Sequence, residues 1–139
     1  MEKYNLDIDI KIFCVTADSF PDGILAAHQK LHSLLPTSAG RNFFGVSRPE
    51  DGSKIIYRAG VEESFGGEAE QYNCEKIIIK KGVYITIDIP DFHKDIQSIG
   101  RAFQELLKDP DIDQEGYCVE MYKGESEVKC MVRLNSKLT

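Results

Sequence analysis

Residues 82–106 carry the pattern that decides the fold: GVYITIDIPDFHKDIQSIGRAFQEL. Apolar and polar side chains alternate over residues 83–89, as they do on a β-strand. Pro90 and Asp91 then open a segment whose apolar residues return at helical spacing, at Ile96, Ile99, Phe103 and Leu106. The stretch therefore predicts a strand followed by an amphipathic helix.

The first half of the chain shows the same order of elements. Residues 5–16 alternate as a strand, and Ser19 is the candidate N-cap of a following helix. The apolar positions of that helix precede those of the second helix by 72 residues, at Ile24, Ala27, Leu31 and Leu34. The matching order predicts that one structural unit is used twice.

Two further strands are predicted after each helix. In the first half they are residues 42–47 and 54–61, joined by a turn at Pro49–Gly52. In the second half they are residues 117–122 and 127–134, and the strand before the second helix covers residues 76–89, with an interruption near Lys81 and Gly82. We therefore expect an α+β fold, with a duplicated strand-helix-strand-strand unit and a mostly antiparallel sheet with two helices on one face.

Length and composition limit the class of protein. The 139 residues, 42% of them hydrophobic, are enough for one domain, residues 1–139, with pseudo-repeats at about 5–61 and 76–134. The formal net charge of −6 argues against direct nucleic-acid binding, which needs clustered Lys and Arg. No apolar run approaches the ~20 residues of a membrane span. Without an apolar signal segment at the start, a cytoplasmic protein is expected.

The cysteines and histidines give no indication of a metal site. Cys14, Cys74, Cys118 and Cys130 lack metal-ligand spacing and are typical of reduced thiols. His28 and His32 are four residues apart on the first predicted helix, where two imidazoles could share a metal or simply lie at the helix surface. No phosphate loop, dinucleotide-binding glycine pattern or Ser-His-Asp order is present, so no cofactor is expected.

Glu120 is the residue most suggestive of chemistry. It lies in the middle of a predicted strand, flanked by Val119 and Met121. If those two residues face the core, Cys118, Glu120 and Tyr122 share the face away from the helices. A carboxylate beside tyrosines could hold a cation through charge and ring quadrupole. The alternative is an ordinary glutamate on the wet face of an antiparallel strand.

Two other tyrosines are candidate ligand contacts. Tyr84 alternates with the apolar residues of its strand and is expected on the same face as Glu120. Tyr57 lies in the first predicted hairpin, where Gly60 could mark a bulge that changes the facing of nearby side chains. Strands favour aromatic residues for packing, so both tyrosines could equally be structural.

The segment between the halves, residues 62–75, is rich in acid. It contains five glutamates, Glu62, Glu63, Glu68, Glu70 and Glu75, together with the pair Gly66–Gly67. We expect a solvated connector rather than a domain boundary, because neither half of about 60 residues is large enough to be stable alone.

Several stretches together resemble the GyrI-like effector-binding family, whose domains are also attached to AraC-type and MerR-type bacterial regulators. The stretches are residues 44–49 (FGVSRP) with 56–61 (IYRAGV), residues 82–84 (GVY), and residues 119–122 (VEMY). The resemblance extends over almost the whole chain. It implies a pseudo-two-fold domain with a ligand groove between its halves.

The resemblance also implies roles for particular residues. In multidrug-sensing members the acidic residue of the E-x-Y strand contacts cationic, aromatic ligands, and this role carries over to Glu120. Tyr84, Tyr122 and Tyr57 would line the groove. The chain departs from its relatives in having no tryptophan, so ligand stacking would be weaker. It also has no room for a helix-turn-helix segment, so it would not itself be a DNA-binding regulator.

Three functions therefore compete. The first is a stand-alone module that binds a hydrophobic, cationic small molecule as a sensor or sequestering protein. The second is a protein-interaction role, with gyrase or a regulator as partner, supported by the net charge and the acidic connector. The third is hydrolysis of electrophilic drugs with Glu120 as acid or base, since some family members resemble such enzymes. Hydrolysis would require a glutamate that is deeply buried.

Overall fold

A computed structural model describes residues 1–50 and 52–135 of the chain. The chain divides into two compact units. Unit 1 comprises Met1–Asp9 together with Lys80–Thr139, and unit 2 comprises Ile10–Ile79. None of the described helices is long and apolar enough to cross a membrane.

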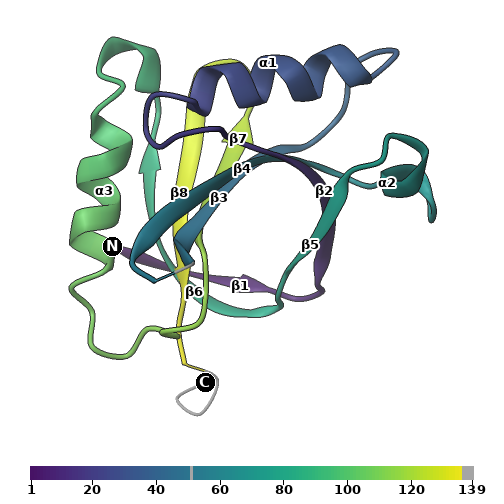
Figure 1. Ribbon diagram of the computed structural model, residues 1–139. Helices are drawn as coiled ribbons and strands as arrows, with labels where there is room; N and C mark the ends of the chain where they lie inside the picture. Colours follow the sequence, from purple (N-terminus) through teal and green to yellow (C-terminus); the bar gives the residue numbers. More distant parts are fainter. Residues whose placement is uncertain (51, 136–139) are drawn as a thin grey trace. The chain divides into compact units, whose positions relative to one another are not determined.

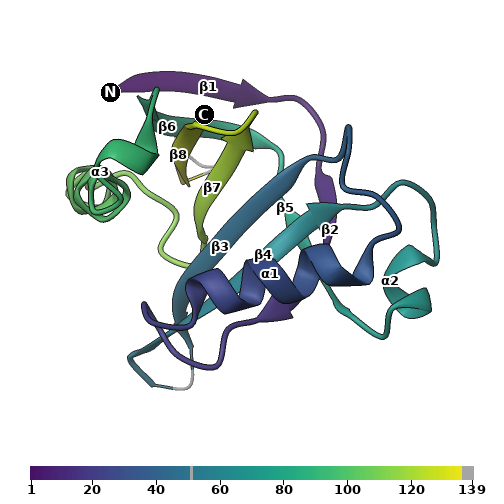
Figure 2. The same cartoon turned by 90° about the horizontal axis from the view of Figure 1, so that it is seen from above.

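Unit 2 is a four-stranded antiparallel sheet with one long and one short helix (Figure 1). Its elements in chain order are β2 (Ile10–Thr16), α1 (Ile24–Leu34), β3 (Phe43–Glu50), β4 (Lys54–Glu62), α2 (Glu68–Gln71) and β5 (Glu75–Ile79). The strand order is β3-β4-β2-β5. In Figure 2 the helix α1 crosses the strands of this sheet obliquely. Its buried Ala27 and Leu31 pack on a core that includes Phe13, Ala59 and Val61.

Unit 1 repeats this plan. Its elements are β1 (Glu2–Leu6), β6 (Gly82–Ile89), the short 3-10 helix η1 (Phe92–Lys94), α3 (Ser98–Leu106), β7 (Cys118–Lys123) and β8 (Glu127–Arg133). All pairings are antiparallel, in the order β1-β6-β8-β7. Ala102, Phe103 and Leu106 of α3 pack on a core that includes Ile85, Val128 and Val132.

The predicted α+β class and the duplicated strand-helix-strand-strand order are therefore confirmed. The turn predicted at Pro49–Gly52 includes Asp51, which lies outside the described residues, and β3 itself continues through Pro49 to Glu50. The single domain and the groove between the halves concern both units together and stay predictions.

The strand predicted at residues 5–16 is in fact two strands, whereas the interruption predicted near Lys81 and Gly82 in the strand 76–89 is confirmed. The first breaks between β1 and β2, and the second between β5 and β6. The two pieces of each long strand belong to different units: β1 pairs with β6 in unit 1, and β5 pairs with β2 in unit 2. At the second break Gly82 has φ +142°, and a Cβ there would lie 2.9 Å from the Arg133 side chain. Only glycine fits this position without strain.

Both helices begin later than the sequence predicts. The N-cap of α1 is Gly23 rather than Ser19, whose carbonyl instead accepts a turn hydrogen bond from the Gly23 N–H. Residues 92–94 form η1 before α3 begins, and Ile96 is 62% exposed instead of contributing to the core. Phe92, which the helical spacing leaves out, is buried in the unit 1 core instead.

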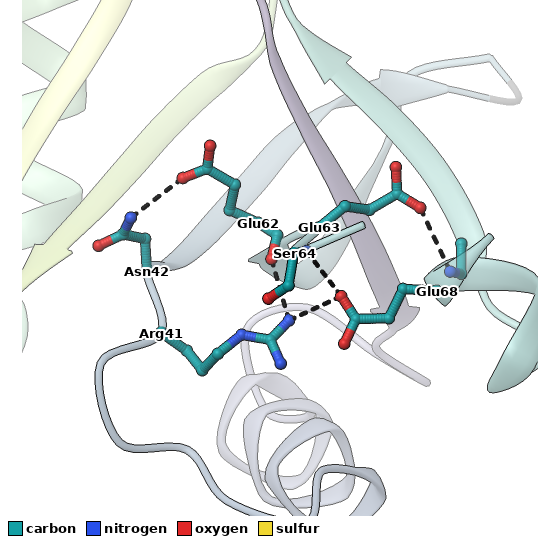
Figure 3. Close-up of polar contacts among 7 residues, drawn as sticks. Arg41, Asn42, Glu62, Glu63, Ser64 and Glu68 are labelled. Carbon is teal, nitrogen blue, oxygen red and sulfur yellow. Dashed lines mark hydrogen bonds and ion pairs between the residues drawn. The ribbon is translucent and has the colours of Figure 1, made fainter. Parts of the chain in front are cut away.

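The acidic connector, residues 62–75, is exposed over most of its length, as predicted, but it is more than a solvated loop. It contains α2, and Glu68 is only 3% exposed. As Figure 3 shows, one Glu68 oxygen accepts hydrogen bonds from Arg41 Nη2, at 2.9 Å, and from the Ser64 N–H, at 2.8 Å. The Glu63 carboxylate accepts the N–H of Ala69 at the start of α2.

The other glutamates of the connector also have partners within unit 2. Glu62 accepts a hydrogen bond from Asn42, Glu70 pairs with Lys76 at 3.0 Å, and Glu75 accepts from Arg58 at 2.9 Å. The carboxylates of the connector therefore have partners within unit 2, although Glu70 and Glu75 stay exposed. Sequence composition could not indicate this, because the partners come from other elements.

Candidate functional site

Glu120 lies on the face of the unit 1 sheet that α3 covers. Directly paired residues of antiparallel strands share a face, and Glu120 pairs with Cys130, which pairs with Ile87. Cys130 and Ile87 belong to the core beneath α3. The prediction that Glu120 faces away from the helices is therefore wrong.

The error has a simple physical origin. Val119 and Glu120 are both buried, although successive residues of a strand point to opposite faces. β7 is thus covered on both sides, and apolar alternation cannot tell which face carries the helix. The predicted grouping of Cys118, Glu120 and Tyr122 on one face does agree with the register.

A hydrogen bond holds the Glu120 carboxylate in place. Tyr122 donates its hydroxyl to Glu120 Oε1 at 2.5 Å. The ring of Tyr122 meets Phe92 edge to face, with centroids 5.5 Å apart. Glu120 is only 7% exposed, so water screens electrostatic attraction to its carboxylate only weakly.

Two thiols share this face. Burial, and then the nearby Glu120 charge, raises the pKa of Cys118 to about 11. Burial also raises the pKa of Cys130 to about 12, with Glu120, Asp88 and Cys118 adding to the effect. Both are free thiols rather than a disulfide. Because the thiolate is the nucleophile, neither sulfur is suited to attack an electrophile at neutral pH.

Tyr84 does not join this group. It pairs with Arg133, and its face carries Thr86 and Met131 rather than the α3 core. Its hydroxyl donates to the Lys80 carbonyl at 2.5 Å, and burial raises its pKa to about 12. The prediction that Tyr84 and Glu120 share a face is wrong, because it assumed that Glu120 lies on the face away from the helices.

Tyr57 belongs to unit 2 and lies in the core beneath α1, where it is 1% exposed. Its hydroxyl is 2.8 Å from His28 Nε2, and Phe20 stacks on its ring. Burial, helped by His32, lowers the pKa of His28 to about 4, so this imidazole is neutral near pH 7. His32 instead stacks on Phe43, and no three His, Cys, Asp or Glu side chains among the described residues are placed to hold a metal.

Solved structures share this fold. An integron cassette protein from the mobile metagenome of Vibrio cholerae matches with a TM-score of 0.69 and 11% identity, over 96% of this chain and 95% of that chain. A hydrolase from Listeria innocua matches with a TM-score of 0.57 and 10% identity, over 96% and 90%. A protein named for bacterial transcription regulation, from Staphylococcus aureus MU50, gives 0.56 and 11%, over 95% and 97%. At these identities the likeness shows the fold alone.

No protein-family model matches the chain, and neither does any curated protein with which it was compared.

Buried cations on the helix-free faces are a feature that the sequence analysis missed. In unit 1, Lys129 Nζ lies 3.0 Å from Asp88 and 5.2 Å from the centre of the Tyr4 ring. In unit 2, Arg58 hydrogen-bonds both oxygens of Glu50 and also Glu75. These hydrogen bonds from Arg58 lower the pKa of Glu50. The available signal was a cation inside an apolar strand, as at Lys129 in EVKCMVR.

The raised thiol pKa values lead to a labelling prediction. At pH 7.5 we expect iodoacetamide to alkylate Cys118 roughly 100-fold more slowly in the folded protein than in urea, because the thiolate population falls about tenfold per pKa unit. Mass spectrometry of timed samples measures the rates. Equal rates in the folded and unfolded protein would contradict the proposed burial of this thiol.

Proposed function

We propose that the protein binds a hydrophobic, cationic small molecule at a site built on Glu120 in unit 1. The observation that supports this most directly is a 7% exposed carboxylate that a tyrosine holds on the sheet face that carries the unit 1 core. Ligand sites commonly combine an apolar lining with a few fixed polar groups. A negative charge in such surroundings favours a cation, and an aromatic ring adds about 0.5–2 kcal/mol when it contacts one.

The hydrogen bond from Tyr122 suits this role. It orients one carboxylate oxygen, so less freedom is lost when a cation is bound. The phenol ring and Phe92 then offer aromatic surface beside the charge. Cys118, on the same face, adds a small polarisable contact.

The repeat supports a charged site in one unit only. In unit 1 Glu120 pairs with Cys130 of the core beneath α3. In unit 2 the residues of β3 that pair with the core residues Tyr57, Ala59 and Val61 are Ser47, Gly45 and Phe43, and none of them carries a carboxylate. We therefore propose one ligand site per chain.

The shared fold gives additional, coarser support. One solved structure with this fold is named for bacterial transcription regulation and another as a hydrolase. Together with the sequence resemblance, this supports the assignment to the GyrI-like effector-binding type, acting as a sensor or sequestering module. The gyrase-inhibitor alternative rested partly on the acidic connector, whose carboxylates are largely engaged within unit 2. Hydrolysis remains a second candidate because Glu120 is buried as an acid-base residue requires.

The proposal is tested with a matched pair of aromatic probes. N-methylquinolinium is a permanent cation, whereas quinoline is neutral at pH 8. We expect calorimetry to give one site per chain for the cation and a Glu120→Gln variant to bind it at least 10-fold more weakly, a loss of about 1.4 kcal/mol or more. Quinoline affinity should change less than threefold.

Glu125→Gln is the control, since it removes the same charge from an exposed residue of the β7–β8 turn. Equal losses for both probes, or equal losses in both variants, would contradict a charge role for Glu120. Formation of a hydrolysis product from an electrophilic ester, abolished by Glu120→Gln, would favour the enzyme instead.

A further inference from the structure

The short helix η1 is tied to the turn between β7 and β8. The Phe92 N–H donates to the Ser126 carbonyl at 3.0 Å. His93 Nε2 lies 2.7 Å from the Glu125 carbonyl oxygen, which can only accept, so the imidazole donates. Both hydrogen bonds join η1 to the hairpin that carries Glu120.

Phe92 links η1 to the candidate site through ring contacts. Its ring packs against His93 on one side, with centroids 4.1 Å apart, and meets Tyr122 edge to face on another. Tyr122 in turn donates to Glu120. A continuous series of contacts therefore leads from an exposed histidine to the buried carboxylate.

From this geometry we infer that Phe92 is a positioning residue of the Glu120 site and that His93 is the latch that keeps it there. The inference rests on the proposed function. A phenol ring can turn about two side-chain bonds, and the hydrogen bond to Glu120 requires the hydroxyl to stay in one place. The edge of Phe92 restricts that turning, and the latch restricts Phe92.

The latch can be released without disturbing the core. Phe92 belongs to the unit 1 core, so truncating it would destabilise the fold as well as the site. His93 is exposed, and its side chain can be removed with little loss of packing. The informative variant is therefore His93→Ala. His93→Gln, whose amide can still donate to Glu125, serves as the rescue variant, and Lys94→Ala is a control within η1.

The test combines a readout that needs no ligand with one that does. Amide exchange measured by NMR should be at least 10-fold faster at Phe92 in His93→Ala, with shifted Tyr122 ring signals, while Tm falls by less than about 4 °C. N-methylquinolinium should bind 3- to 10-fold more weakly, and quinoline should be unaffected within twofold. His93→Gln should return both the amide exchange rate and the affinity for N-methylquinolinium most of the way to the wild-type values. Lys94→Ala should change neither.

The outcomes separate the inference from the proposed function. If Glu120→Gln weakens the cation and His93→Ala leaves exchange, Tyr122 signals and affinity unchanged, the latch is overturned and the site stands. If Glu120→Gln has no effect, or the wild type binds neither probe, the proposed function fails. The exchange and Tyr122 signals then still decide whether His93 positions Phe92. Equal weakening of both probes in His93→Ala would indicate a general loss of structure and would also overturn the inference.

Discussion

An Arg41→Met variant is expected to lose about 3 kcal/mol of unfolding free energy. The reason is the carboxylate of Glu68, because this residue is 3% exposed and forms an ion pair with Arg41 at 2.9 Å. Without the guanidinium, a buried charge would keep only the Ser64 N–H among the hydrogen bonds shown in Figure 3. Urea unfolding at pH 7 measures the loss, and Tm should fall by roughly 10 °C.

The matched control also removes the charge of Glu68, which has lost its ion-pair partner. In the double variant Arg41→Met with Glu68→Gln, the amide can still accept from Ser64 without carrying a charge. We expect this double variant to recover at least 1 kcal/mol relative to Arg41→Met alone. If the two variants unfold at the same urea concentration, the cost comes from the lost arginine contacts, including its approach to the Phe13 ring, and the charge argument fails.

Acid is expected to weaken the fold through His28. Its pKa is about 4 in the folded state and 6.5 when unperturbed, so the unfolded chain takes up a proton first as pH falls. Stability from this group is complete above about pH 6.5 and is lost as pH falls toward 4. Between pH 7.5 and 4.5 the loss should be about 2.5 kcal/mol. Urea unfolding at the two pH values measures it.

A His28→Gln variant isolates this contribution. The amide can still bond the Tyr57 hydroxyl and does not titrate in this range. Its loss of stability between pH 7.5 and 4.5 should be smaller than that of the wild type by about 2 kcal/mol. A His28→Gln variant with the wild-type pH response would show that other groups cause the acid sensitivity.

The fold was largely predictable because its pattern is local and occurs twice. Strand alternation and helical spacing recur 72 residues apart, which is enough to define the strand-helix-strand-strand unit. It was not predictable that β1 would pair in unit 1 and β5 in unit 2, because alternation within a strand carries no information about which strand it pairs with. The predicted helix starts were wrong because helical spacing alone does not show which residues complete the core. Phe92 is buried there, and Ile96 is exposed.

The site was predictable only in part. A charged residue among apolar ones correctly drew attention to Glu120 and to its neighbours Cys118 and Tyr122. Its face was not predictable, because the strand is buried on both sides. Contacts between distant positions were also out of reach. Tyr57 meets His28 from 29 residues away, and Arg41 meets Glu68 from 27 residues away.

The pairing of β1 with β6 also fixes the order in which the two units can be completed while the chain is synthesised. Unit 2 is one continuous stretch, so all of its strands have been synthesised once Ile79 has been added. β1 is made first, yet its partner β6 begins only at Gly82. At about 5–20 residues per second, β1 waits roughly 4 to 15 seconds for that partner. An unpaired strand invites aggregation, and the polar residues Glu2, Lys3 and Asn5 protect this one during the wait.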